Sequence, residues 1–292
     1  MIKRILSTCL LLSSINALAV PFTDIACSAP AGLITNTVGF SVSENLCDFQ
    51  AEQLKLKVYK VAMCTQAPSF DTAIQPNFSS CSFIYNNDTY SEITVSASTG
   101  FNLSGLTKPA AGTYKYILLV TTNDVKIKAQ AHFDTDRTSS LGGGSGRYCW
   151  TNGSVIDYKN GSVTNNQIDP TINITGLSCG SAVDSSYEFN EINWAGAWGR
   201  PENAESVPGG SSVRSFLTAN LLLTTNLPDI IKTAYVNTLE TPITITENTS
   251  ALKMSINITT GATLVFNGSG IIDWIEDAPF AYIIEPVNES IF

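Results

Sequence analysis

The sequence predicts an all-β protein, built as one or more antiparallel β-sandwiches that are disulfide-stapled and contain little helix. Three observations lead to this prediction: alternating apolar and polar residues, turn-forming Gly and Asn residues between them, and an even number of cysteines beyond the first nineteen residues. The 292 residues are 43% hydrophobic and 14% charged, which is typical of a folded chain rather than a disordered one.

The first nineteen residues have the organisation of a cleavable secretory signal. Lys3 and Arg4 are basic, Ile5 to Leu12 is apolar, and Ala17-Leu18-Ala19 is a small-x-small cleavage site. The apolar run is shorter than the about 20 residues that a membrane helix needs. We therefore expect residues 1–19 to be removed and the mature chain to be exported to the periplasm, the cell surface or the extracellular space, in a bacterial host.

Removal of the signal leaves an even set of cysteines for an oxidising compartment. Such a set favours disulfides, although the sequence does not choose their connectivity. We expect neighbours in the sequence to pair, above all Cys64 with Cys81, which bracket a short loop. A zinc site is the alternative; the absence of a CxxC pair and a single histidine, His132, disfavour it. The six candidates are Cys27, Cys47, Cys64, Cys81, Cys149 and Cys179.

The clearest strand patterns lie in the N-terminal half. Residues Leu54 to Cys64 begin with apolar residues that alternate with lysines, which predicts a strand with one wet face. Val125 to Phe133 alternates in the same way. Tyr114 to Thr121 precedes that segment, and Thr122-Asn123-Asp124 between them predicts the turn of a β-hairpin. The outward positions of the Val125 segment are Lys126, Lys128, Gln130 and His132.

Turn signals continue through the second half, and helical signals are sparse. Asn152-Gly153, Asn160-Gly161, Gly176 and Asn267 to Gly270 each lie between short β-branched or aromatic runs. Phe216 to Leu223 is the one helical candidate, but its Thr and Asn content makes a strand at least as favourable. Short strands separated by frequent turns are typical of a sandwich or barrel.

A Gly- and Ser-rich segment divides the chain. Residues 134–147 predict a flexible linker or a long loop. They separate an N-terminal β domain, residues 20–133, from an acidic C-terminal β domain, residues 148–292, which holds most of the excess negative charge. The alternative is one large sandwich whose long loop crosses between its sheets.

One corner resembles a known architecture. The residues Leu106 to Tyr114, LTKPAAGTY, resemble the turn that leads into a strand of immunoglobulin-like and fibronectin-type sandwiches. In that family a tyrosine hydrogen-bonds back across the corner, and the resemblance implies that Tyr114 is this tyrosine and that the N-terminal domain is immunoglobulin-like. The family's buried tryptophan between two cysteines is not recognisable here, so the strand topology is not implied.

No arrangement typical of an enzyme is recognisable. His132 falls on a wet strand face, no GxSxG elbow occurs, and the glycine cluster at 142–146 lacks the lysine of a phosphate-binding loop. Two glycosidase carboxylates cannot be selected among 25 acidic residues. The sequence therefore assigns no catalytic residue and no cofactor, and it favours a non-enzymatic role.

Two groups of acidic residues need an explanation. Asp134 and Asp136 are weak calcium candidates, because the further acids of a calcium-binding loop are missing. The second group lies near the C-terminus, and we expect it to form a solvated acidic face. It consists of Asp273, Glu276, Asp277, Glu285 and Glu289.

The residues Trp194 to Arg200, WAGAWGR, give the strongest indication of ligand binding. Exposed indole rings stack on the faces of sugars, with charged groups as polar partners. The favoured alternative is that both rings fold inward as a plug at one end of a sandwich. The candidate binding residues are Trp194, Trp198, Arg200 and Glu202.

Two functions follow. The first is an exported, non-catalytic structural or adhesive protein that assembles with itself or with other surface proteins by strand addition, donating Val20 to Ile25 or Phe280 to Phe292. The second is a secreted carbohydrate-binding or glycan-cleaving protein that uses the Trp194/Trp198 segment. The net charge of −9 argues against a nucleic-acid partner, and no later apolar run predicts a transmembrane segment.

Overall fold

The computed structural model describes residues 45–96, 106–164, 167–173, 175–182, 187–194, 205–207, 209–224, 226–259, 261–266, 271–278 and 280–288. Within these ranges the chain is all-β, as predicted, and its one helical element is the short 3-10 turn η1 (Leu227–Asp229). The strands are β1 (Asn45–Phe49), β2 (Gln53–Cys64), β3 (Cys81–Ser96), β4 (Gly112–Lys128), β5 (Gln130–Thr138), β6 (Ser145–Trp150), β7 (Val155–Thr164), β8 (Gln167–Ile172), β9 (Ser178–Gly180), β10 (Asn190–Asn193), β11 (Glu205–Val207), β12 (Gly210–Leu217), β13 (Lys232–Ile245), β14 (Thr249–Asn257), β15 (Ala262–Phe266), β16 (Ile272–Asp277) and β17 (Ala281–Asn288).

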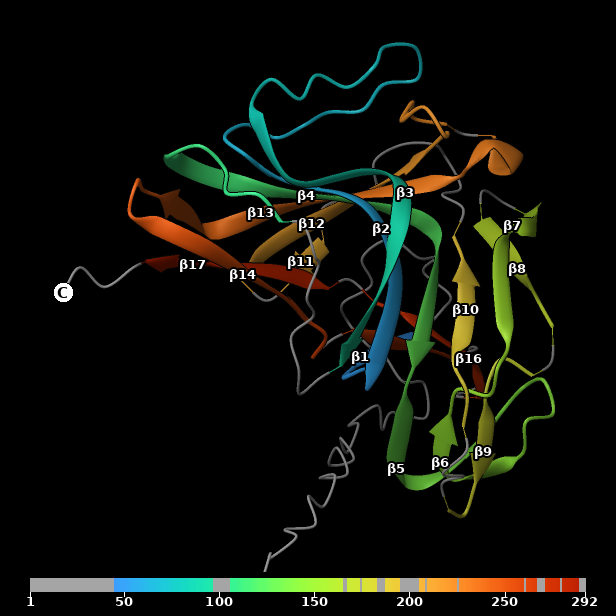
Figure 1. The fold of residues 1–292 in the computed structure, drawn as a ribbon. Helices are drawn as coiled ribbons and strands as arrows, with labels where there is room; N and C mark the ends of the chain where they lie inside the picture. Colours follow the sequence, from blue (N-terminus) through green and yellow to red (C-terminus); the bar gives the residue numbers. More distant parts are fainter. Residues whose placement is uncertain are drawn as a thin grey trace, which may run out of the picture.

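The largest sheet is organised around the long strand β4 (Figure 1). β2 lies along one edge of β4, with β3 outside it. The other edge of β4 is shared, because β13 pairs with its first part and β10 with its last part. β12 and β11 extend the sheet from β13, and β7 and β8 extend it from β10. The pairing of β10 with β7 is parallel, and the other pairs are antiparallel.

The prediction of a hairpin turn at Thr122-Asn123-Asp124 is wrong, because these residues lie inside the continuous strand β4. Thr122 pairs with Lys232 of β13, and Asp124 pairs with Asn193 of β10. The polar side chains have strand contacts instead of turn contacts: the Asn123 Nδ2 donates to the Trp194 carbonyl at 3.1 Å. This polar stretch is where β4 changes its partner strand.

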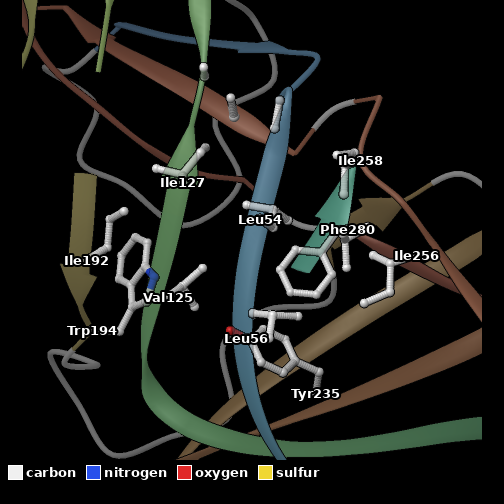
Figure 2. Packing of buried hydrophobic residues seen from close by; sticks show 14 of the residues in the cluster. Leu54, Leu56, Val125, Ile127, Ile192, Trp194, Tyr235, Ile256, Ile258 and Phe280 are labelled. Atoms are coloured by element: carbon white, nitrogen blue, oxygen red, sulfur yellow. The ribbon is translucent and has the colours of Figure 1, made fainter. Parts of the chain in front are cut away.

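Three smaller sheets complete the described structure: β1-β15-β16, β14-β17 and β5-β6-β9. One large cluster of buried side chains joins the main sheet to β1 and β14 to β16. Figure 2 shows Leu54 and Leu56 of β2 beside Ile256, Ile258 and Phe280. The inward residues predicted for β2 and β4 are confirmed, since Leu54, Leu56, Val125 and Ile127 are all essentially inaccessible. The sandwich arrangement itself stays a prediction.

The opposite face of the main sheet is covered at one end only. There Ala62, Leu118 and Ala234 form a second buried cluster under two loops. The loops meet where the Leu223 N–H donates to the Asp71 carbonyl at 2.7 Å. This end of the sheet is therefore buried on both faces, whereas the lysine-bearing parts of β2 and β4 are left outside this cover.

Two disulfides have both cysteines among the described residues, and both join cysteines that are neighbours in the sequence. Cys64 is bonded to Cys81, as predicted, where β2 and β3 pair. Cys149 is bonded to Cys179, where β6 and β9 pair. Cys47 is also disulfide-bonded. Disulfides of this kind are typical of an oxidising compartment.

The segment at 134–147 is a β-hairpin and not a flexible linker. It contains the end of β5, a turn at residues 139–144 and the start of β6. The turn is packed, since the Cys179 N–H donates to the Gly143 carbonyl at 2.7 Å. An added Cβ at Gly143 would lie 2.0 Å from the Leu177 carbonyl oxygen, so only glycine fits there. The glycines that suggested mobility are needed for this close approach.

The sheets combine strands from both sides of the predicted domain boundary. The main sheet takes β2, β3 and β4 from before the hairpin and β7, β10, β12 and β13 from after it. β1 pairs with β15, and one buried cluster extends from Cys47 to Ile284. This pairing favours the single-domain alternative, and the division at 134–147 stays a prediction.

Of the remaining predictions about turns and helices, some are confirmed and others are wrong. Gly153 and Gly176 lie in turns with positive φ, as predicted. Asn160-Gly161 lies inside β7, where the ladder to β8 shifts its register, so a turn there is wrong. Phe216 and Leu217 are the last residues of β12, and a loop follows them. The segment from Phe216 to Leu223 is therefore not a helix. Asn267 to Gly270 falls outside the described residues.

The corner at Tyr114 has the predicted hydrogen bond. The Tyr114 hydroxyl donates to the Ala110 carbonyl at 2.7 Å, and the side chain is buried. This bond fixes the approach of residues 106–111 to β4. It is a local feature that unrelated β-proteins share, so by itself it does not assign a family.

A candidate ligand-binding groove

Trp194 lies in the core and not on the surface. Its side chain is 2% exposed. One ring face stacks on Tyr158 with centroids 4.8 Å apart and an interplanar angle of 8°, and the Arg214 guanidinium lies 4.4 Å from the ring centroid. The structure thus leaves this ring no open face for a sugar. For Trp194 it agrees with the inward alternative; Trp198, Arg200 and Glu202 lie outside the described residues.

A buried charge pair holds the Trp194 ring in place. The indole Nε1–H donates to Asp277 Oδ1 at 2.6 Å, and the Arg214 guanidinium lies 3.9 Å from Asp277 Oδ2. Burial raises the pKa of Asp277, and the nearby Arg214 charge opposes this rise. The three side chains link β10, β12 and β16, so we interpret them as a structural network that joins the sheets.

The C-terminal acidic group is not a solvated face throughout, which corrects the expectation from the sequence. Asp277 and Glu276 are 2% and 1% exposed. Glu276 accepts hydrogen bonds from the Tyr158 hydroxyl and from the Trp274 indole. Glu285 is exposed, as expected, and Glu289 lies outside the described residues. The composition of this segment could not reveal that its two central acids have buried donors.

Buried and accessible side chains alternate along β10. Asn190, Ile192 and Trp194 are buried, whereas the alternate residues at 187, 189, 191 and 193 are partly accessible. Successive side chains of a strand point to opposite faces. Glu191 of β10 therefore points to the outer face of the sheet. Tyr187 and Phe189 precede β10 and lie close to that face, since Lys128 lies over the Tyr187 ring and Lys55 over the Phe189 ring.

The outer face also carries the lysines of β2 and β4. The sequence predicts that Lys55, Lys57, Lys126 and Lys128 point outward, and all four are partly accessible. In the register of the two strands Lys55 lies directly opposite Lys126. The sequence could not place these residues together, because pairing of β2 with β4 joins segments that are far apart in the chain.

These residues form a cavity at the surface, which we call the β2–β4–β10 groove. Its volume is about 470 Å³, within the roughly 300–1,000 Å³ typical of ligand pockets. Gly153 has φ +85° and lies close to the Glu188 carboxylate, so the backbone there has little room for a side chain. The groove is lined by Lys55, Lys126, Gly153, Val155, Tyr187, Glu188, Phe189 and Glu191.

Lysines lie over both aromatic rings of the groove. The Lys55 Nζ lies 4.5 Å from the Phe189 ring centroid, and the Lys128 Nζ lies 4.3 Å from that of Tyr187. The Tyr187 hydroxyl donates to Glu52, and this bond together with burial raises the pKa of Tyr187. The Glu52 carboxylate also accepts from Gln130. The Tyr187 side chain is therefore held in place before any ligand arrives.

Two of the four lysines are neutralised by acids. Lys57 contacts Asp124 at 2.6 Å, and Lys126 contacts Glu191 at 3.2 Å. Within the described part of the chain no ion pair joins Lys55 or Lys128 to an acid. Of the two lysines that line the groove, Lys126 is thus paired with Glu191, whereas Lys55 has no ion pair to a described acid; the lining adds two aromatic rings and a hydrogen-bond acceptor at Glu188.

A second cavity, of about 500 Å³, lies at the β12–β13 end of the sheet. Its lining includes Lys115 and Glu240 but no aromatic residue among those described. Flat aromatic faces together with a few polar groups are what organic ligands require. The β2–β4–β10 groove is therefore the better candidate.

The other candidate site residues stay apart from the groove. Asp136 is exposed on β5, and the side chain of Asp134 is outside the described part of the structure. Among the described residues no group of three or more His, Cys, Asp or Glu could hold a metal ion. His132 stacks on Tyr148 with ring centroids 4.5 Å apart and is partly accessible, consistent with its predicted wet face.

Comparisons with protein-family models, with curated proteins and with solved structures find no match for this chain. The resemblance of the Tyr114 corner to immunoglobulin-like sandwiches therefore gains no support beyond its hydrogen bond. No helix of the described residues has the length and apolar character needed to cross a membrane. The fold and the groove define a disulfide-linked all-β protein with a surface cavity, and its function has to be argued from that cavity.

Proposed function

We propose that this chain is an exported, non-catalytic adhesive β-protein that binds a carbohydrate in the β2–β4–β10 groove. The observation that supports this most is the pair of aromatic rings, Tyr187 and Phe189, beside two lysines and two glutamates that line the same cavity. Aromatic rings contact the apolar faces of sugars, while lysine and glutamate side chains form hydrogen bonds with the sugar hydroxyl groups. Export is supported by residues 1–19 and by the disulfides.

The groove is built on a scaffold suited to adhesion. Its lysines lie on β2 and β4, two central strands of the main sheet. Binding sites on strands are positioned more precisely than sites on loops, because the ladder of hydrogen bonds fixes them. The disulfide between Cys64 and Cys81 joins the far end of β2 to β3. A preformed site loses little entropy when it binds.

Two edges of the main sheet, β3 and β8, disfavour strand addition. The edge strand β3 bulges at Asn87 to Tyr90 opposite Tyr59 and carries Asp88 and Glu92. β8, another edge strand, contains Pro170. Bulges, charges and proline are the devices that prevent edge pairing. The expected donor at the C-terminus is already in use, since β17 pairs with β14.

The test is binding of the mature protein to an array of glycans. We expect binding by the wild type and its loss on the double substitution Phe189→Ala with Tyr187→Ala, because the rings supply the apolar contact. Tyr90→Ala is the matched control, since Tyr90 is an exposed aromatic residue of the same sheet but does not line the groove. Equal binding by the double variant, or no binding by the folded wild type, would contradict the proposal.

A further inference from the structure

We propose that the carbohydrate in the groove is an acidic one, with uronate units, and that Lys55 selects its carboxylate. This inference rests on the proposed function, because it names the class of ligand for the same groove. Its first support is the charge balance: Lys57 and Lys126 have acidic partners, whereas Lys55 is paired with an aromatic ring. Among the described residues no acid forms an ion pair with Lys55, so its charge is available to an anion from outside.

The second support is the register of β2 and β4. Lys55 lies directly opposite Lys126. Like charges at directly opposed positions of an antiparallel pair destabilise a sheet. Glu191 offsets the charge of Lys126 at 3.2 Å, so the charge left in this opposed pair is that of Lys55.

The third support is the Phe189 ring, which offers an apolar contact for a sugar next to the charge of Lys55. The Lys55 Nζ is 4.5 Å from the ring centroid, a distance typical of a cation–π contact. Because Lys55 lies over one face of the Phe189 ring, a pyranose would have to pack against its edge or its other face, with the carboxylate directed towards Lys55. A carboxylate directly attached to the ring, as in a uronic acid, fits this separation.

The acids of the groove restrict how much negative charge the ligand can carry. Glu188 is exposed and Glu191 is partly accessible, and both line the same cavity as Lys55. These carboxylates accept hydrogen bonds from sugar hydroxyls but repel a polymer with sulfate or phosphate at every position. The arrangement thus fits one carboxylate per sugar unit, with free hydroxyl groups beside it.

The experiment measures binding of the mature wild-type protein to three polyuronates, namely polygalacturonate, alginate and hyaluronate, and to their carboxyl-reduced forms. Reduction keeps the sugar backbone and removes the charge. We expect at least one polyuronate to bind, and its reduced form to bind at least about tenfold more weakly, as for loss of one charge-assisted hydrogen bond. Heparin, which is densely sulfated, is expected to bind more weakly than that polyuronate.

Two variants assign the effect to Lys55. Lys55→Met keeps the length of the side chain and removes the charge, so it should bind the polyuronate about as weakly as the wild type binds the reduced form. Lys253→Met is the control, because Lys253 is exposed on β14 and lies outside the groove lining. Circular dichroism of both variants checks that the sheets are intact.

The outcomes separate this inference from the proposed function. Equal binding of a polyuronate and its reduced form, or unchanged selectivity in Lys55→Met, overturns the acidic ligand while binding in the groove stands. Tighter binding of heparin also overturns it. Failure of all three polyuronates overturns the inference when the glycan array shows a neutral ligand, and failure on the array as well overturns both.

Discussion

The carboxylate of Asp277 lies in the core between the Trp194 indole N–H and the Arg214 guanidinium. Burial disfavours its charged form and raises its pKa above the usual value for aspartate. In the unfolded chain the same group returns to its ordinary pKa. Its charge therefore couples the free energy of unfolding to pH.

We predict an unusual sign for this coupling. Because the folded state binds the Asp277 proton more tightly than the unfolded state, protonation of this group stabilises the fold as pH falls from neutral through its raised pKa. The gain is complete below the unfolded value of 3.8. Asp277→Asn lacks this titration, and Arg214 stays charged in both proteins. Urea unfolding at a series of pH values should thus show the wild type gaining stability relative to Asp277→Asn on acidification; a constant difference would contradict this.

Strand β4 shows how one element can have two roles. Its first part pairs with β13, its last part pairs with β10, and the change occurs at the polar residues 122–124. Asp124 contacts Lys57 on the outer face, and the next residue towards the N-terminus, Asn123, contacts the backbone of Trp194. These residues therefore connect the outer face of the sheet to the segment that carries Trp194.

Substitution of Asn123 by glycine distinguishes a strand from a turn. In a hairpin turn, glycine after a polar residue is favourable. In the middle of β4, Asn123→Gly removes the hydrogen bond to Trp194 and adds backbone freedom, so we expect a loss of about 1–2 kcal/mol in the free energy of unfolding. Urea denaturation measures the change. Gly142, at φ +83° in a real turn, gives the comparison, since Gly142→Asn should cost less than Asn123→Gly.

The alternation of β2 and β4 was predictable because it depends on neighbours along the chain. Leu54 and Leu56 point inward and Lys55 points outward, as the period of two requires. The groove was not predictable in the same way, because Lys55, Lys126 and Phe189 come together only through pairing of distant strands. Trp194 was misleading for a similar reason: its partners Arg214 and Asp277 are distant in sequence.

The whole described molecule has one main buried cluster, which includes residues from before and after the 134–147 hairpin. We therefore predict a single cooperative unfolding transition, since neither half retains a complete sheet without the other. Far-UV circular dichroism and tryptophan fluorescence in urea should give coincident curves with the disulfides intact. Two separate transitions would instead support independent domains at 20–133 and 148–292.

The pairing of β1 with β15 affects how the chain reaches its folded state. Asn45 lies opposite Phe266, so nearly all of the described chain separates these two strands. Contacts between such distant residues make folding slow, because a long loop must close before they form. During synthesis β1 has no pairing partner until Phe266 has been added to the chain. The last steps of folding are thus expected only after β15 is available.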